Sequence, residues 1–205
     1  MYFYYAPRTC AVASHIALEE AGADYELRRL DFTKTEQRSA EYLRVNPKGR
    51  VPALVTERGI LTETPAILAY IAQSYPEKQL APLNDPWAFA QMQAFNAYLC
   101  ATVHVCHAHK FRGTRWVDAS ETAAIEAMKR KVPETMAECF QLIEDELFPG
   151  PWVLGNEYSV ADIYLFTLST WLAVDDVDIQ RFPKVADLHQ RMLQKDSVQK
   201  VLAMN

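Results

Sequence analysis

The stretch VPALVTERGILTETPAILAYI, residues 51–71, carries the clearest structural signals in this sequence. Apolar and β-branched residues at 51–56 and again at 60–61 predict two strands, and the charged, glycine-ending segment between them predicts a turn. Thr64 is a good helix N-cap and Pro65 suits the first helical position, so we expect a helix to follow at once. The stretch therefore predicts two paired strands that run directly into a helix.

The residues upstream of this stretch alternate between strand and helix patterns. The expected elements are a buried aromatic strand at 2–6, a helix at 10–21, a second strand at 25–32 and a short helix at 39–45. Together with the later elements they give the order β-α-β-α-β-β-α. This order predicts an α/β domain at the N-terminus.

The pattern changes after about residue 74, because the following residues hold several prolines and everything beyond them has a helical period. We therefore predict an α/β domain at 1–76, a linker at 77–86 and an all-α domain at 87–205. The sequence thus predicts two domains of different class.

Prolines and one capping pattern subdivide the helical part. Pro133, Pro149-Gly150-Pro151 and Pro183 are expected to end helices, which gives about four or five of them. Ser159 followed by Asp162 resembles a capping box in which Asp replaces the usual Glu or Gln. A helix is therefore expected to begin beside Ser159.

Composition narrows the class of function. The chain has 205 residues, of which 50% are hydrophobic, and its net charge is −5. A negative chain offers no basic face for phosphates, and no stretch reaches the about 20 apolar residues of a membrane span, so neither nucleic acid nor membrane is an expected partner. The four cysteines show no disulfide spacing, and we interpret them as reduced thiols of a cytoplasmic protein.

Several motifs resemble the cytosolic glutathione S-transferase family. The matching segments are Asn46-Pro47-Lys48-Gly49-Arg50-Val51-Pro52-Ala53-Leu54, Leu61-Thr62-Glu63-Thr64-Pro65-Ala66-Ile67, Ser159-Val160-Ala161-Asp162-Ile163 and, more weakly, Phe182-Pro183-Lys184-Val185. The start, Tyr5-Ala6-Pro7-Arg8-Thr9-Cys10, is most similar to the bacterial beta class, which has a cysteine at the beginning of helix 1. The resemblance implies a thioredoxin-like N-terminal domain followed by a helical one.

The resemblance also implies an activity. The expected function is detoxifying transfer of glutathione, the co-substrate, to small electrophilic or hydrophobic substrates by a cytoplasmic homodimer without a metal. Two alternatives stay open: a glutathione-dependent disulfide reductase or peroxidase that works through Cys10, and a non-catalytic binder that keeps the fold. An apolar helix at 87–99 supports the dimer, and Phe111 and Trp116 are candidates for the electrophile pocket.

Cys10 is the first candidate catalytic residue. It is expected at a helix N-terminus, whose partial positive charge favours a thiolate, and Arg8 would add to this if its side chain turned inward. Tyr5 competes for the role, because tyrosine-type transferases hold the glutathione sulfur with a tyrosine at the end of the first strand. Taken by themselves, the residues favour a core role for Tyr5 as one of the tyrosines of the first strand. His15 is expected to be a structural histidine with its hydrogen bonds satisfied.

The resemblance assigns the glutathione-binding residues. Val51 and Pro52 match the family's cis-proline corner, where the Val51 backbone would pair with the cysteinyl part of glutathione. Glu63 would accept the γ-glutamyl ammonium, and Thr64 would hold the neighbouring carboxylate at the helix start. For the glycine carboxylate the candidate is Lys34. Lys48 and Arg38 are the reserve candidates.

His104 is the candidate from the helical domain, because beta-class relatives carry a histidine there that faces the glutathione sulfur. The sequence departs from that class nearby, with Val105 in place of a basic residue and Ala11 in place of serine. Cys100, His104 and His107 share one helical face, but they lack a fourth ligand, so no metal is expected.

Overall fold

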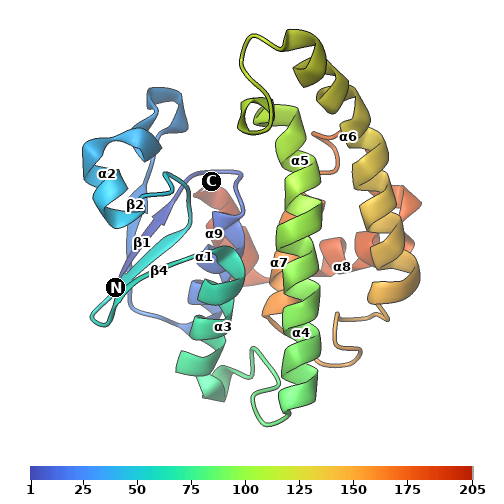
Figure 1. Ribbon diagram of the computed structural model, residues 1–205. Helices are drawn as coiled ribbons and strands as arrows, with labels where there is room; N and C mark the ends of the chain where they lie inside the picture. Colours follow the sequence, from blue (N-terminus) through green and yellow to red (C-terminus); the bar gives the residue numbers. More distant parts are fainter. Residues whose placement is uncertain (205) are drawn as a thin grey trace. The chain divides into compact units, whose positions relative to one another are not determined.

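The computed structural model describes residues 1–204, which divide into two compact units. Unit 1 contains Met1–Phe89 together with the residues from Arg191 onward, and unit 2 contains Ala90–Gln190. Each unit is described by itself below, with the element labels of Figure 1.

Unit 1 is built on a four-stranded mixed sheet. Its strands are β1 (Tyr2–Tyr5), β2 (Glu26–Arg29), β3 (Ala53–Thr56) and β4 (Gly59–Thr62), in the spatial order β2-β1-β3-β4. β1 runs parallel to β2 and antiparallel to β3, while β3 and β4 form the predicted hairpin. Phe3 lies opposite both Leu27 and Leu54, so the central strand carries the core of the sheet.

Four helices accompany this sheet. They are α1 (Ala11–Ala21), α2 (Ala40–Val45), α3 (Thr64–Ser74) and α9 (Asp196–Ala203). Figure 1 shows α1 and α3 together on one side of the sheet and α2 on the other. The element order of the first 74 residues is the predicted β-α-β-α-β-β-α, and the thioredoxin-like arrangement is confirmed.

Two local predictions in unit 1 were wrong. The second strand ends at Arg29 rather than Phe32, because the Asp31 carboxylate accepts the Thr33 N–H at 2.9 Å and starts a 3₁₀ turn. Thr64 is not the N-cap of α3 but its first helical residue, and Glu63 occupies the cap position with a φ of 73°. The Glu63 side chain makes no capping hydrogen bond, as expected.

Helices make up the rest of the chain. α4 (Pro86–Tyr98) continues through a π-helical turn at Leu99–Val103 into α5 (His104–Phe111). α6 (Thr122–Leu142), a second π turn (Ile143–Leu147), α7 (Val160–Ser169) and α8 (Pro183–Leu193) follow. No named strand occurs after β4 in the described part of the chain, as expected for an all-α second half.

Pro133 does not end a helix, which corrects the predicted division. It lies inside α6, which continues past it although a proline cannot donate the backbone hydrogen bond of that position. Within residues 1–204, six α-helices therefore follow β4 and α3 instead of about four or five. The predicted capping box is confirmed, because the Ser159 hydroxyl accepts the Ala161 N–H at 3.2 Å and Asp162 accepts the Ser159 N–H at 2.8 Å.

The compact units differ from the predicted domains at the C-terminus. Helix α9 packs on α1, where Lys200 pairs with Glu19 at 2.6 Å and the Ser197 hydroxyl donates to Glu20 at 2.9 Å. The C-terminal helix therefore groups with unit 1, although the predicted second domain runs to the end of the chain.

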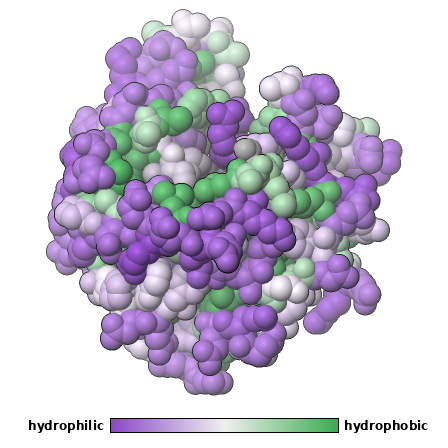
Figure 2. All heavy atoms as spheres, turned by 180° about the vertical axis from the view of Figure 1, so that it is seen from behind, coloured by the Kyte–Doolittle hydropathy of each residue, from purple (hydrophilic) through white to green (hydrophobic). Residues whose placement is uncertain are grey.

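Hydrophilic side chains predominate on the face of the molecule shown in Figure 2, and apolar side chains surface between them in small groups. Among the described helices, none combines the length and the apolar character that crossing a bilayer requires.

Candidate functional site

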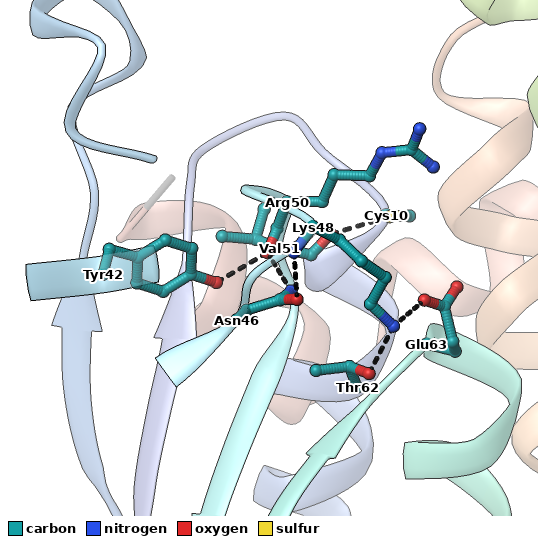
Figure 3. Close-up of polar contacts among 8 residues, drawn as sticks. All are labelled: Cys10, Tyr42, Asn46, Lys48, Arg50, Val51, Thr62 and Glu63. Atoms are coloured by element: carbon teal, nitrogen blue, oxygen red, sulfur yellow. Dashed lines mark hydrogen bonds and ion pairs between the residues drawn. The ribbon is translucent and has the colours of Figure 1, made fainter. Parts of the chain in front are cut away.

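The loop before β3 is held by side chains that reach back to its backbone (Figure 3). Both the Tyr42 hydroxyl and the Asn46 amide donate to the Arg50 carbonyl at 2.6 Å. The Asn46 side-chain oxygen in turn accepts the Lys48 N–H at 3.1 Å. Since Asn46 and Tyr42 are both buried, these contacts fix the position of the next residue, Val51.

The turn within this loop requires glycine. Gly49 has a φ of 60°, and a Cβ added there would lie 2.9 Å from the Gln37 carbonyl oxygen. The loop ends on the bond between Val51 and Pro52, which is cis, as the resemblance implied.

Cys10 lies directly before α1 and is 7% exposed. Its thiol donates to the Val51 carbonyl oxygen at 3.6 Å, so Cys10 contacts the backbone next to the cis-proline. The N-terminus of α1 favours the thiolate form of Cys10, whereas the Val51 carbonyl can accept a hydrogen bond only from the thiol form. The two groups therefore act in opposite directions on the protonation of Cys10. Arg8 is exposed and does not turn inward.

Thr9 is a positioning residue that the sequence did not single out. Its hydroxyl donates to the Ala6 carbonyl at 2.7 Å and accepts the Ala11 N–H at 3.3 Å. It therefore caps the start of α1 from the residue before Cys10. A hydroxyl residue next to a helix start was the signal that could have identified it.

An ion pair between Lys48 and Glu63 lies at the start of α3. The Lys48 ammonium contacts Glu63 Oε1 and donates to the Thr62 hydroxyl at 2.6 Å (Figure 3). Glu63 Oε2 has no hydrogen bond to any described residue, and the Glu63 side chain is 56% exposed. Glu63 thus pairs with Lys48 through one carboxylate oxygen and has its second oxygen available for a further hydrogen-bond donor. Thr64, the next residue, is buried.

Tyr5 packs in the core of unit 1. Its side chain is buried, its ring stacks on Phe3 with centroids 6.5 Å apart, and its hydroxyl donates to the Met204 carbonyl at 3.4 Å. These contacts favour the core interpretation of this tyrosine. Lys34 lies in the 3₁₀ turn after β2, is exposed, and pairs with Asp31 at 3.5 Å.

The prediction that His15 has its hydrogen bonds satisfied was wrong, because both ring nitrogens are buried without a hydrogen-bond partner. The ring is enclosed by Phe3, Tyr5 and Tyr25, whose centroids lie 5.5 to 5.9 Å away. Burial lowers the pKa of His15 to about 4, which keeps the imidazole neutral. The sequence could not reveal this, because two of the rings lie on β1 and the third, Tyr25, lies before β2, and His15 meets them only in the fold.

His104, in unit 2, begins α5 directly after the π turn. Its ring lies edge-on to Trp171 with centroids 5.0 Å apart, and the His107 ring stacks on the same indole at 4.2 Å. His107 Nδ1 lies 2.7 Å from Asp175, whose side chain is fully buried. We refer to His104, His107, Trp171 and Asp175 as the aromatic–histidine cluster.

The cluster explains the shared face of His104 and His107 as packing against Trp171. Trp171 and Asp175 were not predicted, because nothing in their local sequence links them to α5. Phe111 and Trp116 are half-exposed in the same unit and contact His107 and His109 respectively. Within residues 1–204 no group of three potential ligands is close enough to hold a metal ion.

Known proteins share both halves of this chain. Residues 1–73 match the family model for the glutathione S-transferase N-terminal domain, and residues 61–196 match the model for the C-terminal domain. A structure of a glutathione transferase homologue from Sulfitobacter with bound glutathione is 45% identical, with a TM-score of 0.95, and 99% of this chain and 97% of that one are covered.

Two further relatives agree. The glutathione S-transferase GstA of Escherichia coli O157:H7 is 32% identical over 206 residues, covering 99% of this chain and 98% of that protein. The bacterial beta-class enzyme of Sphingomonas chungbukensis is 30% identical with a TM-score of 0.86, covering 100% and 98% of the two chains. With both domain models matched in order, this chain belongs to the glutathione S-transferase family.

Proposed function

We propose that the protein is a glutathione transferase that binds glutathione in unit 1 and adds its sulfur to small electrophiles. One observation carries the proposal: the Cys10 thiol contacts the backbone of the cis Val51–Pro52 corner, in a chain of the glutathione S-transferase family. Relatives of this chain are named glutathione S-transferases, and one solved neighbour holds glutathione.

The polar groups of unit 1 suit the ends of glutathione. The γ-glutamyl ammonium would bind the open Oε2 of Glu63, while Lys48 retains Oε1. The adjacent carboxylate would take the N–H groups at the start of α3, beside Thr64. The cysteinyl backbone would pair with Val51 as an added strand. Lys34, exposed and paired only loosely with Asp31, remains our candidate for the glycine carboxylate.

The chemistry needs a deprotonated glutathione sulfur held next to the electrophile. We assign Cys10 and the start of α1 to the sulfur, in preference to Tyr5, whose hydroxyl is already bonded to Met204. His104 is our candidate for moving the proton, because an imidazole titrates near neutral pH. Binding both reactants raises their effective concentration, which is the main contribution expected from the protein.

Transfer is tested directly by titrating the protein with glutathione and by measuring turnover with an activated aryl halide and an epoxide. Binding accompanied by turnover of either electrophile supports the proposal. Binding without turnover of any electrophile would select the alternative of a non-catalytic glutathione binder.

The second candidate is glutathione-dependent disulfide exchange through Cys10, which its position at a helix start favours. The Cys10 thiolate would attack glutathione disulfide, form a mixed disulfide and release one glutathione thiolate. Cys10→Ser separates the candidates: the transferase proposal expects conjugation to be slowed but retained, because the serine hydroxyl and the start of α1 still face the glutathione sulfur, whereas any disulfide reduction is lost. Mass spectrometry under non-reducing conditions, searching for glutathione on Cys10, provides the second readout.

We further propose a cytoplasmic homodimer, because glutathione is kept reduced there and because α4 exposes Trp87 at 72%. Light scattering should then give about twice the 23.4 kDa of one chain. A monomer at micromolar concentration would overturn this part of the proposal.

A further inference from the structure

Unit 2 contains a pair of cysteines that the proposed transfer does not use. Cys106 lies on α5 and Cys139 on α6, 33 residues later, and their sulfur atoms are 3.8 Å apart. Both are reduced. The two helices pack directly on one another within unit 2, so the proximity belongs to a single compact unit.

We infer that Cys106 and Cys139 form a redox modification site, which a hydroperoxide oxidises to an intramolecular disulfide and glutathione reduces again. The closeness of the two sulfurs carries this inference. A disulfide bond is about 2.05 Å long, so the sulfurs must approach by roughly 2 Å, which side-chain rotation and a small helix shift can provide.

The two thiols have different environments, and from these we infer which thiol reacts with the oxidant and which one then closes the disulfide. Cys106 is about half-buried, whereas Cys139 is 7% exposed, so a small oxidant reaches Cys106 more readily. Hydrogen bonds from Cys139 and Thr135 lower the pKa of Cys106 to about 7, against opposing effects of burial, Glu138 and Asp175. The pKa of Cys139 is raised by the same contact with Cys106 and by burial. Cys106 is therefore the attacking thiolate and Cys139 the resolving thiol.

The steps balance with the hydroperoxide as oxidant. The Cys106 thiolate attacks the peroxide oxygen, the O–O bond breaks, and the alcohol or water leaves with a proton from solvent, giving a sulfenic acid. The Cys139 sulfur then attacks Cys106, the S–O bond breaks, and the hydroxyl leaves as water with the Cys139 proton. Two glutathione molecules reduce the disulfide and leave as glutathione disulfide.

The bond would change the helical unit physically. It closes a loop of 33 residues and ties α5 to α6 beside the π turn that precedes His104. Closing such a loop restricts the unfolded chain, so the oxidised protein should melt at a temperature higher by on the order of 5 °C or more.

The test exposes the reduced full-length protein to one equivalent of hydrogen peroxide, alkylates the remaining thiols and maps cross-linked tryptic peptides by mass spectrometry. Cys100 and Cys106 fall in the same tryptic peptide, so Cys100→Ser is the matched control. The expected result is a Cys106–Cys139 cross-link in the parent and in Cys100→Ser. Cys106→Ser and Cys139→Ser should lack it, and millimolar glutathione should remove it.

Two results would overturn the inference. One is a parent protein whose Cys106 proceeds to sulfinic acid while Cys139 remains alkylatable. The other is a cross-link that joins Cys139 to Cys100. The peptide map of the parent protein tests the inference even if a serine variant fails to fold. Cys139→Ala provides a second, apolar substitution at that buried position.

Discussion

The two units hold their chemically important residues in different ways. In unit 1 the site is a backbone loop at 46–52. The Asn46 side chain donates to the Arg50 carbonyl and accepts the Lys48 N–H. The Val51 carbonyl of the same loop accepts the Cys10 thiol. In unit 2, the aromatic–histidine cluster is assembled by side-chain stacking between α5 and Trp171 in the turn after α7. A backbone site depends on local turn chemistry, whereas a stacked site depends on packing between distant segments.

The largest effect should come from the stacked site. Trp171 is 5% exposed and supports both histidine rings, so Trp171→Ala should lower the free energy of unfolding by about 3–5 kcal/mol. The matched control is Trp116→Ala, since Trp116 is 43% exposed and its loss should therefore cost clearly less than the loss of Trp171. Chemical denaturation of both variants checks the prediction. Equal costs would mean that the cluster does not organise unit 2.

Asn46→Ala tests the backbone site in the same way. The substitution removes two hydrogen bonds, including one to the Arg50 carbonyl, from a residue that is 1% exposed. We expect a loss of about 2 kcal/mol in unfolding free energy and glutathione binding on the order of 10-fold weaker. Asn84→Ala, in an exposed turn, is the control. Unchanged glutathione affinity in a folded Asn46→Ala protein would show that the loop does not form the binding surface.

The buried imidazole of unit 1 predicts a smaller, pH-dependent effect. The pKa of His15 falls from 6.5 in the unfolded chain to about 4 in the fold, so the folded state excludes the proton. The neutral His15 therefore leaves the free energy of unfolding unaffected above pH 6.5, and this free energy falls as the pH drops from 6.5 toward 4. At pH 5 the loss from this residue is about 2 kcal/mol. His15→Leu should remove this part of the dependence when urea unfolding is compared at pH 7.5 and pH 5. A His15→Leu protein that loses as much stability between the two pH values as the parent would contradict the prediction, because the raised pKa of the buried Asp162 carboxyl gives the parent an opposing pH dependence.

The difference between the units also explains what the sequence could predict. The strand and helix order of unit 1 follows from alternating patterns and from residues that act locally, such as Gly49 in a turn and Pro65 at the start of α3. The cis-proline corner was predicted by resemblance. The capping box at Ser159 was predicted because both partners lie within four residues.

Contacts between distant segments could not be predicted. The Lys48–Glu63 pair joins two family motifs that lie 15 residues apart in the sequence, and Asp175 lies 68 residues from His107. Pro133 was a misleading local signal, since packing of α6 outweighs one missing hydrogen bond. The approach of Cys106 to Cys139 likewise appears only once α5 and α6 are paired.

The most direct test of the central claim is glutathione affinity after Glu63→Gln, measured by calorimetry. The substitution keeps size and polarity but removes the charge that would accept the γ-glutamyl ammonium, and Glu63 caps nothing with its side chain. Glu57→Gln, in the exposed β3–β4 turn of the same unit, is the charge-matched control. Charge-assisted hydrogen bonds contribute about 1.5–3 kcal/mol, so Glu63→Gln should bind glutathione on the order of 10- to 100-fold more weakly, while Glu57→Gln binds as the parent does. A folded Glu63→Gln protein with parental affinity would contradict the proposed glutathione site.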